Sequence, residues 1–404
     1  MAQRKIKVLV VTHAFPTKYN PAATFILNQL QELKRFCDIK VVVPYPYVPK
    51  IKFLNPYYRF SQIRDKEIFG GIEVYHPKFF MFPRILFLSK LVNILLVIDA
   101  FFSYASSKKT VRRIMEEWNP DIIHLHGPLG DGLIGVYIKK GYKKPLLITV
   151  HGEDVTKYLK LPLSKTLIKF TFKSSDAIIC QSKFLENEIR KSGVKGNKFH
   201  IIPMGAKTGR FRPRNKEVAR EKLGLPKDKK IILFVGHLTE RKGVIYLIKA
   251  MNSVIKENKK ILCCMIGAGV YEQLCKKMIS DFKLEPYIRL LGLKSNDEVA
   301  LYINACDIFV LPSLMEGLPV VLCEALLSGT PVVATAVAGT PELVTKDVGY
   351  LVRPKDPEGL SQKILLALDK KWDKKELLKR GNEFSTYNSV KKLVAVYKYL
   401  LNRT

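Results

Sequence analysis

The sequence lacks the features that mark a secreted, metal-binding or disulfide-linked protein. Its seven cysteines form no C-x-x-C pair and lie mostly in apolar runs, so we expect buried thiols in a reducing compartment. The apolar run at the start is too short for a signal peptide, and export is not expected. No H-E-x-x-H motif, D-x-D motif or cysteine cluster is present, so we expect no metal and no cofactor.

Long uncharged apolar runs are also missing. The longest apolar stretch, residues 85 to 105, contains Lys90, Asn93 and Asp99. These groups are costly at the centre of a bilayer, so a membrane-spanning helix is not expected there. The stretch remains consistent with a buried helix or with one that lies at an interface.

Acidic charge is scarce, with 36 Asp and Glu against 68 Lys and Arg, and the formal net charge is +32. The basic residues are spread over both halves of the chain, whereas a DNA-binding protein usually concentrates them on one element, so nucleic acid is not an expected partner. This even distribution is consistent with binding to an anionic membrane surface or to phosphate-bearing substrates. It is also consistent with lysines that are merely solvated on every face of the protein. Only residues 301 to 350 escape the surplus, with Lys346 as their single base.

The chain length and the pattern of apolar runs predict two α/β domains. At 404 residues the chain is longer than a single hydrophobic core usually supports, so two domains are expected. Short apolar runs alternate with amphipathic helical segments, which is typical of doubly wound parallel sheets. We predict a first domain of residues 1–205, a second domain of residues 206–385, and a final helix, residues 386–404, that packs back on the first domain. The runs are KIKVLVV, DIKVVVP, DIIHLHG, PLLITVHG and DAIICQS, then KIILFVG, KILCCMIG, IRLLG, DIFVLPS and PVVAT.

The segment LPSLMEGLPVVLCEALLSGTPVV, residues 311 to 333, places two glutamates in the base-poor region. Its pattern predicts a strand, a loop that carries Glu316, and a helix that begins near Pro319 and carries Glu324. A helix start offers unpaired N–H groups to a phosphate, and Gly317 lets backbone approach it closely. The two acids would then bind hydroxyl groups on either side of a diphosphate.

That segment resembles the paired-glutamate signature of the retaining, nucleotide-sugar-dependent glycosyltransferases of family 4. The segments ITVHGED, IIPMGAKTGRFRP, VGHLTERKG and LLGLKSNDEVALYINACDIFVLPS also follow the order of that family. The resemblance implies the GT-B fold, in which two Rossmann-like domains face a central cleft. It implies that the first domain binds the acceptor and the second binds the donor.

The resemblance implies roles for the residues around the glutamate pair. Glu316 would contact hydroxyls of the donor sugar near the reacting carbon and counts as a catalytic residue. Gly317, Leu318 and Pro319 would line the donor site, with backbone amides of the first two close to the ligand. Glu324 would bind the ribose diol.

The segment VGHLTERKG supplies the phosphate side of the implied donor site. Lys242 matches the family's phosphate-binding lysine, whose ammonium would neutralise the leaving diphosphate. Gly236 and Arg241 would also bind the donor. The family commonly has arginine where this chain has His237, and commonly has aspartate where it has Lys207, so one diphosphate contact stays in question unless Arg241 compensates.

The acceptor side is less well encoded. His151 matches a family histidine that faces the donor sugar across the cleft, where it would position groups and stabilise charge. Asp154 is a weaker candidate, and Ala23 stands in a loop where the family often has glycine. His124 and His126 are interpreted as groups that hold a strand end.

The expected activity is transfer of a sugar, with retention, from a nucleotide-diphosphate sugar to a glycan or lipid-linked acceptor in cell-surface polysaccharide or glycoconjugate synthesis. The expected location is the cytoplasm, on the cytosolic membrane surface. A GT-B nucleotide-sugar epimerase and a non-catalytic membrane- or polyanion-binding protein remain alternatives. A nicotinamide site in MIGAGVYEQL is not expected, because Glu272 stands where the third glycine of that motif belongs.

Overall fold

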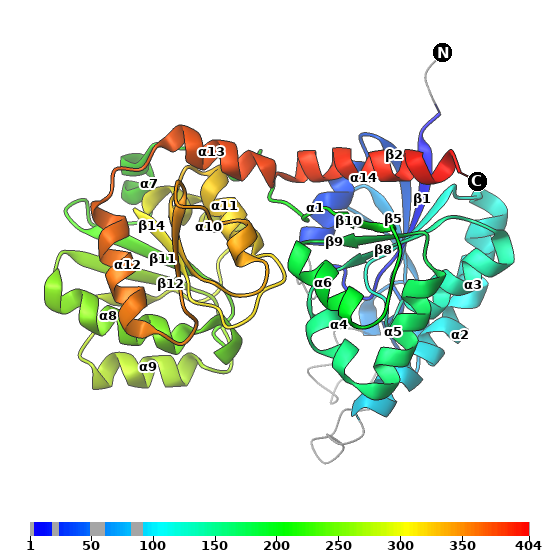
Figure 1. Ribbon diagram of the computed structural model, residues 1–404, viewed down its shortest axis with the longest axis horizontal. Coiled ribbons are helices and arrows are strands. Elements are labelled where there is room, and N and C mark those ends of the chain that lie inside the picture. The colour runs from blue at the N-terminus through cyan, green and yellow to red at the C-terminus, as the bar shows by residue number, and fades with distance from the viewer. Residues whose placement is uncertain (1–3, 18–23, 49–60, 82–91, 404) are drawn as a thin grey trace. The chain divides into compact units, whose positions relative to one another are not determined.

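The computed structural model describes residues 4–17, 24–48, 61–81 and 92–403, and the chain forms two compact units (Figure 1). Unit 1 comprises residues 1–204 together with 389–404, and unit 2 comprises residues 205–388. Each unit has a largely parallel sheet with helices on both faces, as the alternation of apolar runs and amphipathic segments predicts.

The sheet of unit 1 has the strand order β10-β9-β8-β7-β1-β2-β5-β4. All neighbours pair in parallel except β4 and β5, which form an antiparallel edge. The five predicted strands are confirmed, whereas β4, β5 and β10 were not predicted because they are short and only partly apolar. The strands are β1 (Ile6–Val11), β2 (Cys37–Val42), β4 (Lys66–Phe69), β5 (Ile72–Tyr75), β7 (Ile122–Leu125), β8 (Leu146–Val150), β9 (Ala177–Cys180) and β10 (Phe199–Ile201), beside a small pair, β3 (Tyr45–Pro46) and β6 (Lys78–Phe79).

The helices of unit 1 cover both faces of this sheet. Helices α2, α3 and α5 pack on one another and bury the side chains of Ile123 and Leu125 beneath them. The helices are α1 (Thr24–Leu33), α2 (Val92–Trp118), α3 (Gly132–Tyr142), α4 (Glu153–Thr156), η3 (Tyr158–Lys160), α5 (Pro162–Ser174), α6 (Lys183–Lys191) and the end of α14 (Thr386–Leu401).

Helix α14 returns to unit 1, which confirms the predicted packing of the C-terminal helix on the first domain. Its Tyr397 is fully buried, and the Tyr397 hydroxyl lies 2.6 Å from Nδ1 of His124 on β7. The other ring nitrogen of His124 lies 2.8 Å from Oγ1 of Thr149 on β8. Burial lowers the pKa of His124 to about 3, so its imidazole is neutral and its hydrogen bonds join two strands to the last helix.

Unit 2 has a six-stranded parallel sheet of order β13-β12-β11-β14-β15-β16, the arrangement of a dinucleotide-binding Rossmann sheet. The five predicted strands are again confirmed, and β16 extends the sheet beyond them. The strands are β11 (Lys230–Val235), β12 (Ile261–Ile266), β13 (Ile288–Leu290), β14 (Ile308–Leu311), β15 (Val332–Thr335) and β16 (Gly349–Val352).

Two groups of helices enclose that sheet (Figure 1). Helices α8, α9 and α12 pack together, and α7, α10, α11 and α13 form the other group. The helices are α7 (Lys216–Lys222), η4 (Glu240–Lys242), α8 (Val244–Glu257), α9 (Glu272–Asp281), α10 (Asn296–Ala305), α11 (Val320–Leu327), η5 (Thr340–Glu342), α12 (Pro357–Asp369) and α13 (Lys374–Glu383).

The expectations for cysteines and for membrane helices can also be compared with the fold. All seven cysteines are free and buried, as predicted. Among the described residues, no helix is both long enough and apolar enough to span a bilayer. The apolar stretch from residue 85 enters the described chain at α2, and its residues 85–91 lie outside the described residues.

We predict that Tyr397→Phe lowers the free energy of unfolding of unit 1 by about 1 to 3 kcal/mol, because a buried imidazole nitrogen of His124 loses its partner. Unit 1 contains Trp118 and unit 2 contains Trp372, the two tryptophans of the chain. Denaturant unfolding followed by Trp118 fluorescence in a Trp372→Phe background therefore reports unit 1.

Tyr399 on the same helix is 51% exposed and serves as the control. Tyr399→Phe should change the free energy of unfolding by less than about 0.5 kcal/mol. Equal effects of the two substitutions would contradict the assigned role of the Tyr397–His124 hydrogen bond.

Candidate active site

Three loops of unit 2 meet at the carboxyl ends of β11, β12 and β14, the edge where ligands bind in doubly wound sheets. Glycines hold them in contact. Gly243 has a φ of +67°, and a Cβ on it would lie 1.9 Å from the carbonyl oxygen of Pro312. Gly267, with φ +142°, would place a Cβ 1.9 Å from the carbonyl oxygen of Gly236. The glycines of MIGAGVYEQL thus serve loop packing in this fold.

A buried ion pair joins the first of these loops to the third. Nζ of Lys242 lies 2.6 Å from Oε1 of Glu316, and the hydroxyl of Ser313 donates to the same oxygen at 2.6 Å. Glu316 is 6% exposed. The sequence predicted both residues as donor contacts, but their pairing was missed because they are 74 positions apart. The positive charge beside Glu316, which lies in a segment almost without basic residues, therefore comes from Lys242 in another loop.

Helix α11 begins beside this pair. Pro319 occupies the position before the first helical residue, and no side chain caps the helix start. In the first turn the N–H of Leu322 donates to the carbonyl of Pro319 at 3.1 Å, which leaves the N–H groups of Val320 and Val321 at the helix start to face an anion. Leu318 buries its side chain in the core, so only its backbone can serve a ligand. Gly317 lies in the loop between Glu316 and the helix.

Glu324 lies on α11 and is partly buried. Burial raises the pKa of its carboxyl to about 8, although the charge of Arg210 partly opposes the shift. The protonated form of its side chain is therefore favoured at pH 7.

The other residues of VGHLTERKG that the sequence predicts to bind the donor are Gly236 and Arg241. A Cβ on Gly236 would lie 3.7 Å from Cδ of Lys242, so this glycine adjoins the lysine stem. The carbonyl of Arg241 accepts a hydrogen bond from the N–H of Leu314 at 2.7 Å, which fixes the first loop to the third. The side chains of Arg241 and His237 are exposed.

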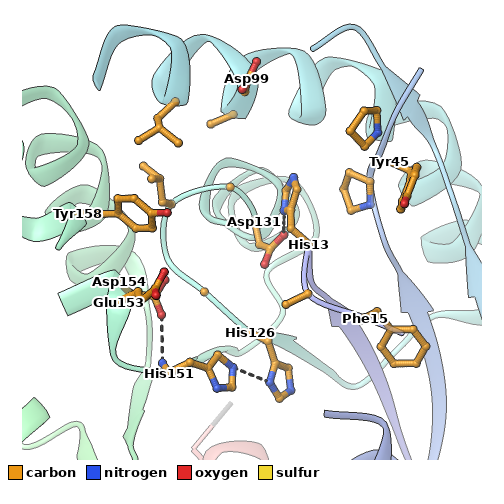
Figure 2. A pocket seen from close by; sticks show the side chains of 18 of the residues that line it. His13, Phe15, Tyr45, Asp99, His126, Asp131, His151, Glu153, Asp154 and Tyr158 are labelled. Atoms are coloured by element: carbon orange, nitrogen blue, oxygen red, sulfur yellow. Dashed lines mark hydrogen bonds and ion pairs between the residues drawn. The ribbon is translucent and has the colours of Figure 1, made fainter. Parts of the chain in front are cut away.

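Unit 1 contains a separate cavity of about 560 Å³, lined from several loops at the carboxyl ends of its strands (Figure 2). Four carboxylates, three histidines and five aromatic rings line it, and none of the described lining residues is Lys or Arg. Its chemically active lining residues are His13, Asp99, His126, Asp131, His151, Glu153 and Asp154. Among the described residues, no group of three or more acids, histidines or cysteines is arranged to hold a metal ion.

His151 is held by hydrogen bonds within unit 1 (Figure 2). The side-chain amide of Gln181 donates to Nδ1 of His151 at 2.8 Å, so the hydrogen of this imidazole is on Nε2. Nε2 of His151 lies 3.2 Å from Nδ1 of His126 and donates to it. Burial lowers the pKa of His151 to about 4 and that of His126 well below its ordinary value, so both rings are neutral.

Asp154 lies next to His151, as their shared motif suggests. Its Oδ2 accepts a hydrogen bond from the backbone N–H of His151 at 3.0 Å. Burial raises the pKa of Asp154 to about 6, and the nearby charges of Asp131 and Glu153 add to the shift. Ala23, the other predicted acceptor-side residue, lies outside the described residues.

The cavity also contains a pair that the sequence did not reveal. Nδ1 of His13 binds Oδ1 of Asp131 in a short contact, and Nε2 of His13 lies 3.1 Å from Oγ of Ser103. Burial lowers the pKa of His13, but the charge and hydrogen bond of Asp131 outweigh it and raise the pKa above its ordinary value. The available signal was positional, since both residues follow strand ends.

Comparisons with known proteins address the whole chain. The family described as Glycosyltransferase Family 4 matches residues 96–210, and the family described as Glycosyl transferases group 1 matches residues 215–384. A glycosyltransferase of Bacillus subtilis strain 168 assigned to teichuronic acid biosynthesis, TuaC, is 30% identical over 371 residues, which is 89% of this chain and 88% of that protein.

Solved structures resemble the fold over almost the full length. Sucrose-phosphate synthase from Thermosynechococcus elongatus has a TM-score of 0.77 at 20% identity and covers 99% of this chain and 100% of its own. HepE from Anabaena in complex with UDP-glucose has a TM-score of 0.68 at 16% identity, with coverage of 98% and 100%. These likenesses confirm the predicted fold class.

The raised pKa of Glu324 predicts a pH dependence of stability. Between its ordinary pKa of 4.5 and about 8, the carboxyl is protonated in the folded protein and ionised in the unfolded one. The stability contributed by the neutral carboxyl is therefore complete below pH 4.5 and lost as the pH rises through about 8. Relative to Glu324→Gln, the wild type should lose up to about 1.4 kcal/mol of unfolding free energy per pH unit in that window.

Denaturant unfolding of both proteins in a Trp118→Phe background, from about pH 5 to 9, measures this difference, with Trp372 fluorescence as the reporter of unit 2. Glu285 is an exposed glutamate of the same unit, and Glu285→Gln should leave the pH dependence unchanged. A difference between wild type and Glu324→Gln that stays constant over the range would show that Glu324 is ionised in the folded protein.

Proposed function

Because this chain belongs to the family 4 glycosyltransferases and has their GT-B fold, we propose that it transfers a sugar from a nucleotide-diphosphate sugar to a glycan or lipid-linked acceptor, with retention of configuration. The observation that carries the proposal is the buried pair of Lys242 and Glu316 beside the uncapped start of α11. An ammonium, a carboxylate and free helix N–H groups in one place match the groups of such a donor.

The donor diphosphate would bind at the start of α11. Its negative charge competes with Glu316 for the Lys242 ammonium, which can turn towards the phosphate because lysine is flexible. Glu316 is then freed to accept hydrogen bonds from hydroxyls of the donor sugar. Glu324 lies on α11, four residues after the first helical residue, and would accept hydrogen bonds from the two ribose hydroxyls. Gly236, Arg241 and the loop of Gly317 and Pro319 complete this donor site.

Bond cleavage leaves the diphosphate with an additional negative charge on its terminal oxygen. Lys242 and the helix N–H groups stabilise that charge as it develops, and this supplies the main catalytic effect of the protein. The same oxygen can accept the proton of the acceptor hydroxyl on the face from which it leaves, which gives retention. Since the lysine and helix already neutralise the leaving group, we propose that no metal is required.

The acceptor would bind in the cavity of unit 1, where hydrogen-bonding groups and aromatic rings alternate. His151 and Asp154 would contribute there, His151 through positioning and charge stabilisation. The relative assigned to teichuronic acid biosynthesis supports a polysaccharide or glycoconjugate product for this chain as well. The UDP-glucose bound by HepE makes that nucleotide sugar the first donor to test.

We propose that unit 1 binds the cytosolic face of an anionic membrane through an α2–α5 surface. This surface is defined by Ile94, Phe101 and Phe102 of α2 with Leu163 and Phe170 of α5, all between 41% and 56% exposed. The starts of the two helices are tied, because Oδ1 of Asn93 accepts from the N–H and hydroxyl of Ser164. The next turns of α2 carry four exposed basic side chains, Lys108, Lys109, Arg112 and Arg113. Apolar side chains next to basic ones are typical of surfaces that bind the headgroup region of a membrane.

Replacement of the donor-site pair tests the transfer function. Nucleotide sugars, beginning with UDP-glucose, are screened for thermal stabilisation, and transfer to lipid-linked and soluble glycans is then assayed with the stabilising donor. We expect Lys242→Met and Glu316→Gln each to lower kcat by about 10²- to 10³-fold. Each single change also leaves one buried charge without its partner and should destabilise unit 2.

The double variant Lys242→Met/Glu316→Gln separates these two effects. It removes both charges, so its stability should recover towards that of the wild type, while its kcat should stay as low as in the single variants. Recovery of kcat together with stability would mean that the pair is only structural. If no nucleotide sugar stabilises the wild type, the donor proposal fails.

Membrane binding predicts a second result. The variant Phe101→Ser/Phe102→Ser should reduce co-sedimentation with phosphatidylglycerol vesicles by about tenfold or more, because burial of each ring contributes about 1.5 to 3 kcal/mol. Wild-type binding should weaken with added salt and with phosphatidylcholine vesicles. Leu293→Ser, at a leucine of unit 2 that is 74% exposed, should leave vesicle binding unchanged. Equal binding by all three proteins would exclude the α2–α5 surface.

A further inference from the structure

The cavity of unit 1 has an electrostatic character opposite to that of the chain. The chain has nearly twice as many basic as acidic side chains, 68 against 36. Four carboxylates nevertheless line the cavity, from Asp99, Asp131, Glu153 and Asp154, and none of its described lining residues is Lys or Arg. Of the lining histidines, His126 and His151 are neutral, and His13 is paired with Asp131. The cavity therefore has an excess of negative charge.

Two of these carboxylates converge on one point. Asp131 gives Oδ1 to His13, and Asp154 gives Oδ2 to the backbone N–H of His151. Their other oxygens lie 3.6 Å (Asp131 Oδ2) and 3.8 Å (Asp154 Oδ1) from the place where a side chain of Gly127 would begin. Among the described residues, neither of these two oxygens has a hydrogen-bond partner. Each carboxylate is thus fixed by one oxygen and leaves the other for a ligand.

Gly127 keeps the space between the two carboxylates open. Its φ of +137° is a conformation that residues with a side chain rarely adopt, and any Cβ would enter that space. Gly130 likewise leaves room for the His13 ring, because a Cβ on Gly130 would lie 2.7 Å from it. The oxygens of Asp131 and Asp154, two of the lining side chains drawn in Figure 2, therefore lie on the two sides of the space that Gly127 leaves open.

We propose that this cavity selects an uncharged sugar, whose hydroxyls donate to Asp131 and Asp154, and rejects sugars that carry a carboxylate or phosphate. Hydrogen bonds from hydroxyls to fixed carboxylates are charge-assisted, and the rings of Phe15, Tyr45 and Tyr158 provide apolar surface for the C–H faces of a pyranose. An anionic sugar would instead meet like charge in a partly desolvated site, because four carboxylates line the cavity and His13 can offset only one of them. The inference rests on the proposed function, since it names the acceptor class of the transfer reaction.

Binding of matched sugars to the full chain tests the selectivity. The probes are the methyl glycosides of glucose and galactose against those of glucuronic and galacturonic acid, measured by ligand-observed NMR at neutral pH. The neutral member of at least one pair should bind about tenfold or more tighter than its acid. Asp131→Asn and Asp154→Asn should each weaken neutral binding about tenfold to a hundredfold and reduce the discrimination.

Two further variants and a second assay make the result decisive. Asp38→Asn removes the same charge from an exposed strand position of unit 1 and should change neither affinity nor discrimination. Circular dichroism identifies any variant that fails to fold, and the two carboxylates are independent probes if one does. Equal or tighter binding of the acids, binding of no neutral sugar, or unchanged discrimination in both folded Asn variants would overturn the proposal.

Nucleotide release from a stabilising donor separates this inference from the proposed function. If transfer occurs and an acidic acceptor is preferred, the selectivity inference fails and the transferase function stands. If neutral sugars bind with the expected dependence on Asp131 and Asp154 but no donor supports transfer, the cavity inference stands and the transfer proposal fails.

Discussion

The arrangement of the loops at the strand ends of unit 2 depends on the ion pair between Lys242 and Glu316. A charge in that position is stable only with its partner, so the two loops that carry the pair must stay together. Gly243 permits this by letting the Pro312 carbonyl approach its backbone closely. Ser313 adds a second donor to the same carboxylate oxygen. The start of α11, which follows directly, is thereby held beside a cation.

The same ion pair also determines which kind of ligand can separate Lys242 from Glu316. The charges of the pair balance each other until an anion arrives, and only a ligand with negative charge of its own can release the ammonium without leaving it unpaired. A neutral sugar has no negative charge that could take the place of Glu316 beside Lys242. In the proposed donor site, the pair would therefore favour a diphosphate-linked donor over a free sugar. Binding of the phosphate would release Glu316, the carboxylate that we propose contacts the sugar.

The sequence predicted the elements of this arrangement better than its contacts. Apolar runs bounded by turns located ten strands, and the strand-to-helix transition placed Glu316 in a loop and Glu324 on a helix. Such local patterns contain no information on which loops touch, so the pair formed by Lys242 and Glu316 could not be read from them. Gln181, His13 and Asp131 were missed because each is an unremarkable polar residue after a strand. Their roles arise only from the three-dimensional proximity that the sheet order creates.

The histidines of unit 1 show how burial adjusts charge in the cavity of that unit. Imidazoles in an open cleft would be partly protonated near neutral pH and would offset the carboxylates there. Gln181 and His151 instead form a hydrogen-bonded series with His126, and burial lowers the pKa of both histidines, so these rings contribute hydrogen bonds without positive charge. Only His13 keeps a raised pKa, and its charge is already paired with Asp131. The negative character of the cavity therefore depends on the neutral His126 and His151 as much as on the acids themselves, because His13 can offset only one of the four carboxylates that line it.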